Sequence, residues 1–258
     1  MKFTVLTLFP EITDAYFSSS IMAKALEKGI IRYHPVNIRD FATDKHKTCD
    51  DAPYGGGPGM LMLAEPLKSA LESVPGAISE SAAKTVPGAA HVIYLSPSGR
   101  PFTQKRAKEL AAMEELVLIC GRYEGIDQRI IDRYVDEELS VGDYVLSSGE
   151  TAALVVIDTV YRLVDKVINA QSLEEESFCG GLLEYPQYTR PEIFDTIKVP
   201  EILLSGHHEN IRKWRLKKRV EKTLAVRPEL VEKGLQEGIF DAETLKLIEE
   251  RMKDNERD

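Results

Sequence analysis

Residues 91–164 read HVIYLSPSGRPFTQKRAKELAAMEELVLICGRYEGIDQRIIDRYVDEELSVGDYVLSSGETAALVVIDTVYRLV, and the pattern of this stretch decides the fold class. Short apolar, β-rich runs alternate with longer segments of helical character. The predicted elements are strands at His91–Leu95, Leu116–Cys120 and Leu139–Leu146, and helices at Thr103–Met113, Ile126–Tyr134 and Glu150–Val164. Because strand and helix alternate, we expect an α/β fold in which a parallel sheet carries helices on both faces.

The chain before this stretch extends the same pattern. Phe3–Phe9 is apolar and short, which predicts a buried strand that Pro10 ends. The other predicted elements are a helix at Thr13–Lys28 closed by Gly29, a short strand at Val36–Ile38 and a short helix at Glu65–Ser73. Ser73–Ala90 is rich in Pro, Gly, Ala and Ser and predicts an exposed connection.

The pattern changes after about Lys166. Asn169–Gly181 is polar, and beyond Pro200 the sequence predicts helices only, with Leu216, Val220 and Leu224 forming an apolar stripe. Asp241 is expected to cap a last helix. We therefore predict three parts: an α/β domain at 1–168, a linker at 169–182 and a small all-helical domain at 183–258.

Composition excludes several classes of protein. The chain has 258 residues, a net charge of -9 and 43% hydrophobic residues, which excludes general disorder. The N-terminal apolar run is short and meets Glu11 at once, so it does not resemble a signal peptide. The longest apolar stretch, Thr151–Val164, contains Asp158 and Arg162 and falls short of the roughly 20 apolar residues of a membrane span. We expect no membrane partner.

The three cysteines, Cys49, Cys120 and Cys179, are far apart in the sequence. No CxxC motif or His/Cys cluster indicates a metal site, so no metal ligand is predicted. An odd number of scattered cysteines is typical of a protein in a reducing compartment, and we expect a cytoplasmic location.

A basic segment stands out in this acidic chain. Ser205–Thr223 contains seven lysines and arginines against Glu209 and Glu221. Most such segments are solvated helix faces, and charge alone favours that interpretation. Because local patches rather than net charge bind nucleic acids, an RNA-binding surface is the alternative.

The glycine-rich stretch PYGGGPGM, Pro53–Met60, predicts a special loop. Glycines let a backbone approach a ligand closely and expose N–H groups. The stretch is not a P-loop, because no Gly-Lys-Ser/Thr follows, and its glycine spacing differs from the dinucleotide fingerprint. A ligand-binding loop and a tight structural turn are about equally favoured.

Three predicted strands run into turns of small residues. The turns are YLSPSG at 94–99, CGRYEGID at 120–127 and SVGDYVLSSGE at 140–150. Ligands of open α/β sheets bind beyond the carboxyl ends of the strands. One such turn alone would be a connection, but three on successive strands favour a pocket made of backbone groups.

Taken together, these segments resemble one family. Over Leu8 to about Pro228, the chain is similar to the bacterial tRNA (guanine-N1)-methyltransferases, the TrmD family of the SPOUT superfamily. The motifs that carry the resemblance are LFPE at 8–11, RDFATDKHKTCDDAPYGGGPGMLM at 39–62, YLSPSGR at 94–100, CGRYEGID at 120–127, VGDYVLSSGE at 141–150, ESFCGGLLEYPQYTRP at 176–191 and VPEILLSGHHENIRKWR at 199–215. The length and rarity of these motifs make chance agreement negligible.

The resemblance implies a fold and a reaction that spacing does not show. The α/β domain would contain a C-terminal trefoil knot, and the protein would be a homodimer with active sites shared between subunits. S-adenosylmethionine would be the methyl donor, with magnesium as an additional cofactor for which the sequence shows no ligand cluster. The substrate would be tRNA, bound through its anticodon stem-loop and methylated at N1 of guanosine 37.

The resemblance also implies site residues. Arg162 and the carboxylates Glu124 and Glu176 would be catalytic: a carboxylate would accept the N1 proton and the guanidinium would hold O6. Surface charge is the alternative interpretation of the run Glu174–Glu176. The cofactor would be bound by Tyr94, Leu95, Ser96, Pro97, Gly121, Tyr123, Glu124, Val141, Gly142, Asp143, Tyr144, Val145, Leu146, Ser148 and Gly149. RNA would be bound by Tyr54, Gly55, Arg212, Lys213, Arg215 and Lys218.

The chain departs from the family pattern at three places. Glu176 stands where the family usually has an aspartate, which keeps the carboxylate and adds a methylene. Ser148 stands for a glycine, so its Cβ is expected to crowd the cofactor or shift the backbone. Thr151 and Ala152 replace Leu-Pro, which loosens a turn. Three rival interpretations remain: a knotted methyltransferase for another RNA position, an RNA-binding protein without catalysis, and a dinucleotide-binding enzyme.

Overall fold

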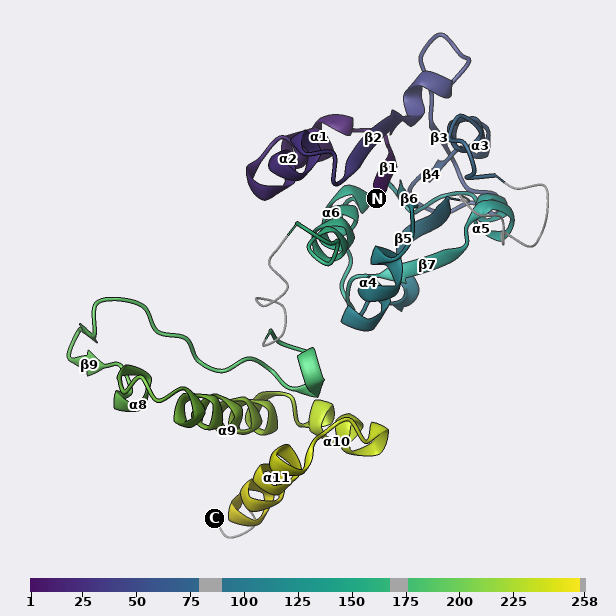
Figure 1. Cartoon of the computed structure of the whole chain (residues 1–258). Helices are drawn as coiled ribbons and strands as arrows, with labels where there is room; N and C mark the ends of the chain where they lie inside the picture. Colours follow the sequence, from purple (N-terminus) through teal and green to yellow (C-terminus); the bar gives the residue numbers. More distant parts are fainter. Residues whose placement is uncertain (79–89, 168–175, 256–258) are drawn as a thin grey trace. The chain divides into compact units, whose positions relative to one another are not determined.

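The computed structural model describes residues 1–78, 90–167 and 176–255, shown in Figure 1. The chain divides into two compact units, Met1–Ile168 and Asn169–Asp258. Each unit has its own apolar core. Within the described ranges, no helix is long and apolar enough to cross a membrane.

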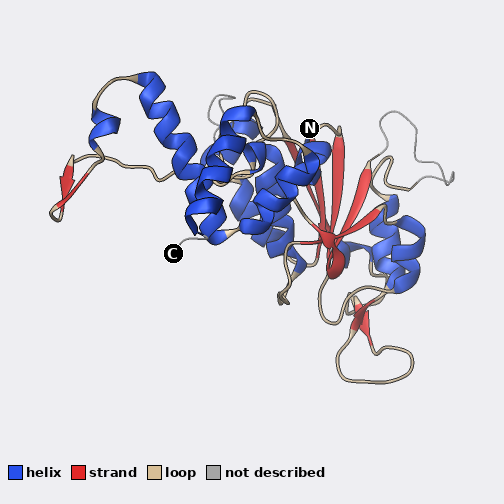
Figure 2. Cartoon of the chain, turned by 90° about the horizontal axis from the view of Figure 1, so that it is seen from below, coloured by secondary structure: helices blue, strands red, loops and turns tan. Residues whose placement is uncertain are grey.

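The first unit is built on a five-stranded parallel sheet. Its strands follow the order β2-β1-β6-β5-β7, and every neighbouring pair is parallel. The strands are β1 (Lys2–Thr7), β2 (Arg32–Asn37), β5 (His91–Pro101), β6 (Glu115–Cys120) and β7 (Glu137–Ser140). In Figure 2 they form a fan, with their ends gathered toward one edge.

Both faces of this sheet are covered because its strands are apolar on both sides. In β6, Leu116 and Leu118 face one core and Val117 and Ile119 face the other. The first core is covered by α1 (Pro10–Phe17), α2 (Ser20–Glu27), α4 (Gln104–Ala111) and α6 (Gly149–Tyr161). The second is covered by η1 (Ile38–Phe41), α3 (Ala64–Glu72) and α5 (Gln128–Tyr134). The predicted α/β class is confirmed.

Two predicted elements of this unit are wrong. The single helix expected at Thr13–Lys28 is two helices, because Ser20 has a positive φ of 54° that breaks the helical path. The strand expected at Leu139–Leu146 ends at Ser140, because Gly142 turns the chain with a φ of 153°. Residues 141–147 are therefore free to form a loop at the end of the sheet.

Strand β5 contains a bulge at its carboxyl end. Leu95 and Arg100 both pair with Leu139 of β7, so residues 96–99 protrude from the sheet before pairing resumes. Gly99 lies at the return point, where a Cβ would come within 2.6 Å of the Glu138 and Leu139 backbone. The first of the three predicted small-residue turns is thus a protrusion within a strand.

The glycine-rich stretch lies at the tip of a short hairpin. Strands β3 (Asp50–Asp51) and β4 (Leu61–Met62) are antiparallel and flank it. The hairpin is tied to the turn that follows β6, because Met62 donates from its backbone N–H to the Gly125 carbonyl at 2.9 Å. Tyr54 is fully exposed on this loop, and Gly55 has a positive φ of 89°.

The second unit has a small helical core. Its helices are α8 (Glu201–Leu204), α9 (His208–Val226), α10 (Pro228–Glu237) and α11 (Ala242–Asn255), after the short η2 (Cys179–Gly181). Leu182, Val220, Val231 and Ile248 form the core, with Leu216 and Leu224 packed against it, which confirms the predicted stripe. Asp241 accepts a hydrogen bond from the Thr244 backbone N–H at 2.8 Å, which confirms it as a cap.

The prediction of an all-helical domain at 183–258 is wrong in one respect. Residues 193–198 form a two-stranded hairpin, β8 (Ile193–Phe194) and β9 (Ile197–Lys198). A two-residue turn joins the strands, with Asp195 and Thr196 both at positive φ. The turn contains no glycine, so it lacks the strongest sequence signal for a hairpin.

Candidate functional site

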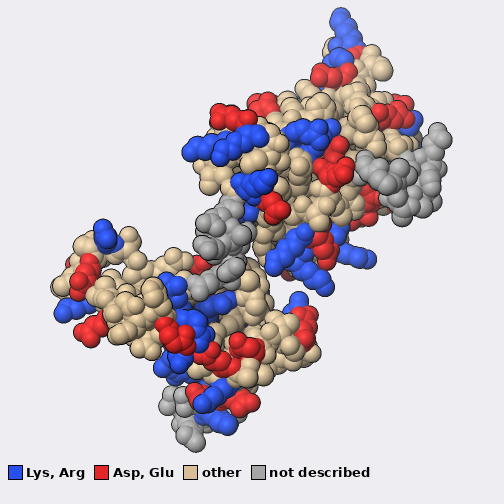
Figure 3. Space-filling view, viewed as in Figure 1, with Lys and Arg blue, Asp and Glu red and all other residues tan. Residues whose placement is uncertain are grey.

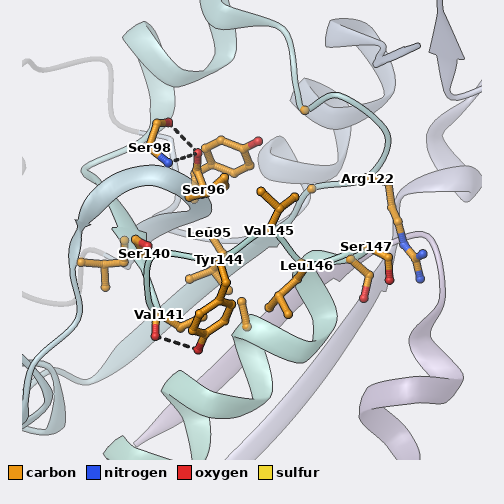
Figure 4. Close-up of a pocket in the computed structure, with 18 of the residues that line it drawn as sticks. Leu95, Ser96, Ser98, Arg122, Ser140, Val141, Tyr144, Val145, Leu146 and Ser147 are labelled. Carbon is orange, nitrogen blue, oxygen red and sulfur yellow. Dashed lines mark hydrogen bonds between the residues drawn. The ribbon is translucent and has the colours of Figure 1, made fainter. Parts of the chain in front are cut away.

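A pocket of about 320 Å³ lies beyond the carboxyl ends of β5, β6 and β7. It is formed by the β5 protrusion, the turn after β6, the loop after β7 and the start of α6, as Figure 4 shows. The three small-residue turns singled out in the sequence therefore meet at one place. The pocket lies within the first unit.

All the residues predicted to bind the cofactor line this pocket except Asp143. The pocket brings these side chains and turns together, and whether they bind a cofactor stays a prediction. The pocket is also lined by residues that were not predicted to bind the cofactor: Ser98, Arg122, Gly125, Leu139, Ser140, Ser147 and Ala152. All of these except Leu139 and Ala152 belong to the three small-residue turns, so those turns could have indicated them.

Backbone contacts determine the floor of the pocket. The Gly149 N–H, at the start of α6, donates to the Gly121 carbonyl at 2.9 Å. A Cβ on Gly149 would lie 2.5 Å from the Gly121 nitrogen and 2.7 Å from the Cys120 Cα. No side chain fits there without moving the backbone, so the helix start and the strand end require glycine for their contact.

Ser148 is accommodated without backbone strain. It is the N-cap residue of α6 with φ -156° and ψ 143°, an extended conformation that any residue adopts. Ser148 lines the pocket, and whether its Cβ crowds the cofactor or shifts the backbone stays a prediction.

Tyr94 forms one wall of the pocket. Its side chain is buried, and its ring would lie 3.0 Å from a Cβ on Gly121. Burial raises the pKa of Tyr94, and the Glu138 carboxylate raises it further, against a smaller lowering by a hydrogen bond with the Ile126 backbone. The phenol therefore stays neutral at physiological pH.

The turn after β6 holds a constrained residue. Tyr123 has a positive φ of 57°, which is uncommon for a bulky side chain. Burial raises the pKa of its hydroxyl, the Asp50 carboxylate raises it further, and Arg39 lowers it by less. The charge of Asp50, at the start of β3, thus acts on a residue that lines the pocket.

The loop after β7 forms the exposed rim. Tyr144 folds back so that its hydroxyl donates to the Val141 carbonyl at 3.0 Å, a contact visible in Figure 4. Val145 next to it is 84% exposed. On the opposite side, Ser96 and Ser98 hydrogen-bond through their hydroxyls at 2.7 Å.

The three predicted catalytic residues have different surroundings. Glu124 lines the pocket and packs against the glycine loop, since a Cβ on Gly59 would lie 2.4 Å from the Glu124 Cγ. Arg162 is the half-buried C-cap residue of α6 and is not among the pocket-lining residues. Glu176 belongs to the second unit. Glu174 and Glu175 lie outside the described residues.

Glu176 begins a tight turn that α9 holds. The Cys179 N–H donates to the Glu176 carbonyl at 3.1 Å, and Phe178, at a positive φ of 71°, donates to Leu182 at 2.8 Å. Arg219 of α9 donates to the carbonyls of Cys179 and Leu183 at 2.6 and 3.2 Å. The position of Glu176 within the second unit thus depends on a basic residue that points inward.

The predicted RNA-binding residues of α9 are not equally available. Arg212 pairs with Glu209 and with Glu243 of α11 at 2.9 and 2.8 Å, and Lys218 pairs with Glu221 at 2.7 Å. Arg215 lies over the Tyr185 ring, with 4.6 Å from its Cζ to the ring centre. Lys213 is 59% exposed and lies 3.5 Å from Glu209. Figure 3 shows Lys and Arg side chains interspersed with Asp and Glu side chains on the surface of the second unit.

No metal centre accompanies the pocket in the part of the chain that the structure describes. Over residues 1–78, 90–167 and 176–255, there is no group of three or more His, Cys, Asp or Glu side chains placed to hold a metal ion.

An open parallel sheet with a glycine- and serine-rich pocket beyond three neighbouring strand ends defines an α/β protein that binds a small ligand or cofactor. The family described as tRNA (Guanine-1)-methyltransferase TrmD matches residues 1–233. The chain belongs to this family, which confirms the family expected from the sequence motifs.

Named relatives agree with this assignment. A tRNA (guanine-N(1)-)-methyltransferase of Treponema denticola is 62% identical over 250 residues, covering 97% of this chain and 98% of the relative. Proteins of the same name from Borreliella burgdorferi and Treponema pallidum are 60% and 56% identical. These matches cover 92% and 97% of this chain, and 95% and 96% of the relatives.

Proposed function

We propose that the chain transfers a methyl group from S-adenosylmethionine to N1 of guanosine 37 in tRNA. Its family and the names of its relatives confirm that it is a tRNA (guanine-N1)-methyltransferase. The observation that supports the proposed cofactor site is the pocket beyond β5, β6 and β7, because the turns predicted to bind the cofactor surround it.

The pocket fits the chemistry of this cofactor. Its volume of about 320 Å³ is within the usual range for small-molecule sites. Gly121 and Gly149 line the pocket with backbone where a side chain would not fit, and backbone groups can read an adenine edge. The Glu124 carboxylate on the wall complements a positively charged ligand. When bound there, S-adenosylmethionine supplies a methyl group activated by its sulfonium.

The roles of the catalytic residues follow from the reaction. Guanine N1 carries a proton that must leave, and Glu176 accepts it as general base. Negative charge then grows on O6, where the Arg162 guanidinium stabilises it. Holding N1 in line with the methyl group supplies the rest of the acceleration.

The proposal includes the architecture that the resemblance implies. In this proposal the 1–168 domain contains the trefoil knot and the cofactor site. Residues 169–182 are the linker, and the 183–258 domain binds the anticodon stem-loop. Two subunits share each active site, and the enzyme works in the cytoplasm. We also propose that methyl transfer depends on magnesium. Measuring methyl transfer with and without EDTA tests this requirement.

The testing experiment is methyl transfer from labelled S-adenosylmethionine to two tRNA transcripts. One transcript carries guanosine at positions 36 and 37, and the matched control carries adenosine at 37. We expect label only in the first transcript, located at N1 of guanosine 37.

The other outcomes identify the rivals. No label in either transcript, with the cofactor still bound, would indicate another RNA target. Absence of cofactor binding in calorimetry would favour an RNA-binding protein without catalysis.

A further inference from the structure

Behind the pocket lies a buried carboxylate that the proposed mechanism does not use. Glu150 is the second residue of α6 and is 0% exposed. It is not among the residues that line the pocket. A buried charge costs several kcal/mol in desolvation unless it is paired and hydrogen-bonded, so its contacts indicate what it does.

Glu150 contacts two parts of the chain that meet at the pocket end of the sheet. Its Oε1 accepts a hydrogen bond from the Thr7 hydroxyl, at the end of β1, at 2.5 Å. Its Oε2 lies 3.2 Å from Arg122 Nε, in the turn that follows β6. The carboxylate therefore joins the end of β1, the start of α6 and the pocket turn.

The contact with Arg122 is an ionic attraction rather than a directional bond. Arg122 Nε and Glu150 Oε2 are both buried, and neither has a hydrogen-bond partner among the described residues. On its other side the Arg122 guanidinium lies over the Phe9 ring, 4.4 Å from the ring centre. Charge on one side and an aromatic face on the other fix the direction of this side chain.

Arg122 occupies a position from which it controls the pocket turn. It lies between Gly121 and Tyr123, and all three line the pocket. Its carbonyl accepts from the Gly125 N–H at 3.1 Å, closing the turn. Tyr123 has a positive φ, and a bulky residue keeps such a strained conformation only when the contacts around it impose it. Figure 4 shows the Arg122 side chain at the margin of the site, directed away from Ser96 and Ser98.

We propose that Glu150 is a positioning residue: through Arg122 it holds the turn at residues 121–125 in the conformation that binds the cofactor. This inference rests on the proposed cofactor site. Glu150 touches neither the pocket nor any reacting atom, so its effect reaches the cofactor only through the turn.

The test removes the charge of Glu150 without changing the shape of its side chain. Glu150→Gln keeps the side-chain volume and the acceptor for Thr7, but it removes the negative charge that attracts Arg122. We expect the KM and Kd for S-adenosylmethionine to rise about tenfold while kcat changes less than about threefold. The KM for tRNA should stay unchanged.

The matched control is Glu137→Gln at the other end of the sheet. Glu137 begins β7 and, like Glu150, pairs with an arginine, accepting from Arg106 at 2.6 and 3.0 Å. It does not line the pocket. We expect this variant to lower the melting temperature and leave the KM for S-adenosylmethionine unchanged.

A double variant keeps the proposal testable if the single one fails to fold. Glu150→Gln with Arg122→Gln leaves no uncompensated buried charge and is expected to fold. If Glu150 acts through Arg122, the double variant should have the same KM for S-adenosylmethionine as Arg122→Gln alone, so the two effects are not additive.

The results separate this proposal from the proposed function. Wild-type protein that binds no S-adenosylmethionine would overturn both. Wild-type binding together with an unchanged KM in Glu150→Gln, or in the folded double variant, would overturn the positioning role alone. Independent, additive effects of Glu150 and Arg122 would overturn it as well.

Discussion

The residues around the pocket of the first unit belong to turns held by a sheet that helices cover on both faces. The RNA-binding candidates of the second unit are instead side chains of one helix, α9, of which Arg212 and Lys213 are exposed and Arg215 and Lys218 are half-buried. Gly121 and Gly149 contribute to the pocket through their backbone. Lys213 contributes only a charge on a flexible stem. The first kind of site depends mainly on packing, so ligand binding there should vary less with salt concentration than binding to the second, whose charges salt screens.

The two units also differ in how their cores are stabilised. The first has an extensive apolar core on each face of its sheet, while the second has four buried apolar residues at its centre. Surface ion pairs such as Arg212–Glu243 supplement the second core, but exposed pairs of this kind add little stability. The second unit should therefore unfold first.

The largest expected effect concerns Glu176 and tests whether turnover can be lost while cofactor binding is kept. Glu176→Ala removes the proposed proton acceptor, so turnover should fall by about 10²- to 10⁴-fold. Because Glu176 belongs to the second unit, the Kd for S-adenosylmethionine should change less than about twofold. Calorimetry and single-turnover methyl transfer measure the two quantities. Normal turnover would show that Glu176 is not the base, and lost cofactor binding would contradict the separation.

The next largest effect concerns the close backbone contact between Gly149 and Gly121 in the pocket. Gly149→Ala places a Cβ 2.5 Å from the Gly121 nitrogen, and overpacking of this kind costs about 1–3 kcal/mol. We expect at least a tenfold weaker Kd for S-adenosylmethionine and a lower melting temperature. The control is Gly29→Ala, where φ is positive but nothing lies within 4 Å, so stability alone should fall. Equal cofactor affinity in both variants would contradict the close-contact argument.

A smaller effect distinguishes two basic residues of α9. Lys213→Gln should weaken tRNA binding about threefold and reduce the slope of log Kd against log salt by about one, because one phosphate contact is lost. Arg219→Gln should instead lower the melting temperature of the second unit, since Arg219 holds the Cys179 and Leu183 carbonyls. Filter binding at several salt concentrations and thermal unfolding measure these effects. Identical salt slopes for wild type and Lys213→Gln would remove Lys213 from the RNA surface.

The smallest effect concerns acid stability of the first unit. Burial raises the pKa of Glu137, but hydrogen bonds from His91 and Arg106 outweigh burial and hold it below the ordinary 4.5. A depressed carboxyl pKa stabilises the fold above pH 4.5, and this stabilisation is lost as the pH falls through the depressed value. Glu137→Gln should cost about 1 kcal/mol at pH 7 and much less near pH 3. Urea unfolding at both pH values measures it, and a cost that grows toward low pH would contradict the sign.

Much of the first unit could be predicted because its signals are local. A continuous apolar run such as Leu116–Cys120 indicates a buried strand by itself, and small residues after each strand indicate turns. The split between α1 and α2 could not be predicted, because a serine at positive φ has no sequence signal at Ser20. The end of β7 was missed because residues 141–146 are apolar enough to resemble a strand.

The candidate site, too, could be predicted only in part from the sequence. The turns could be named from the sequence, but their meeting at one pocket depends on the strand order, which a single sequence does not give. The pairing of Glu150 with Arg122 and Thr7 joins positions as far as 143 residues apart in the chain, and no spacing predicts it. The hairpin β8–β9 was missed because its turn, Asp195-Thr196, lacks glycine.

The bulge in β5 has a consequence for the entropy of ligand binding. Pairing resumes after the protrusion, where Arg100 and Pro101 lie beside Leu139 and Ser140, and the Phe102 N–H donates to Ser140 at 2.8 Å. Both ends of the Ser96–Gly99 segment are thus tied into the sheet, which leaves few conformations to lose when a ligand arrives. Backbone amides at Arg100 and Phe102 should therefore exchange their hydrogens slowly even in ligand-free protein.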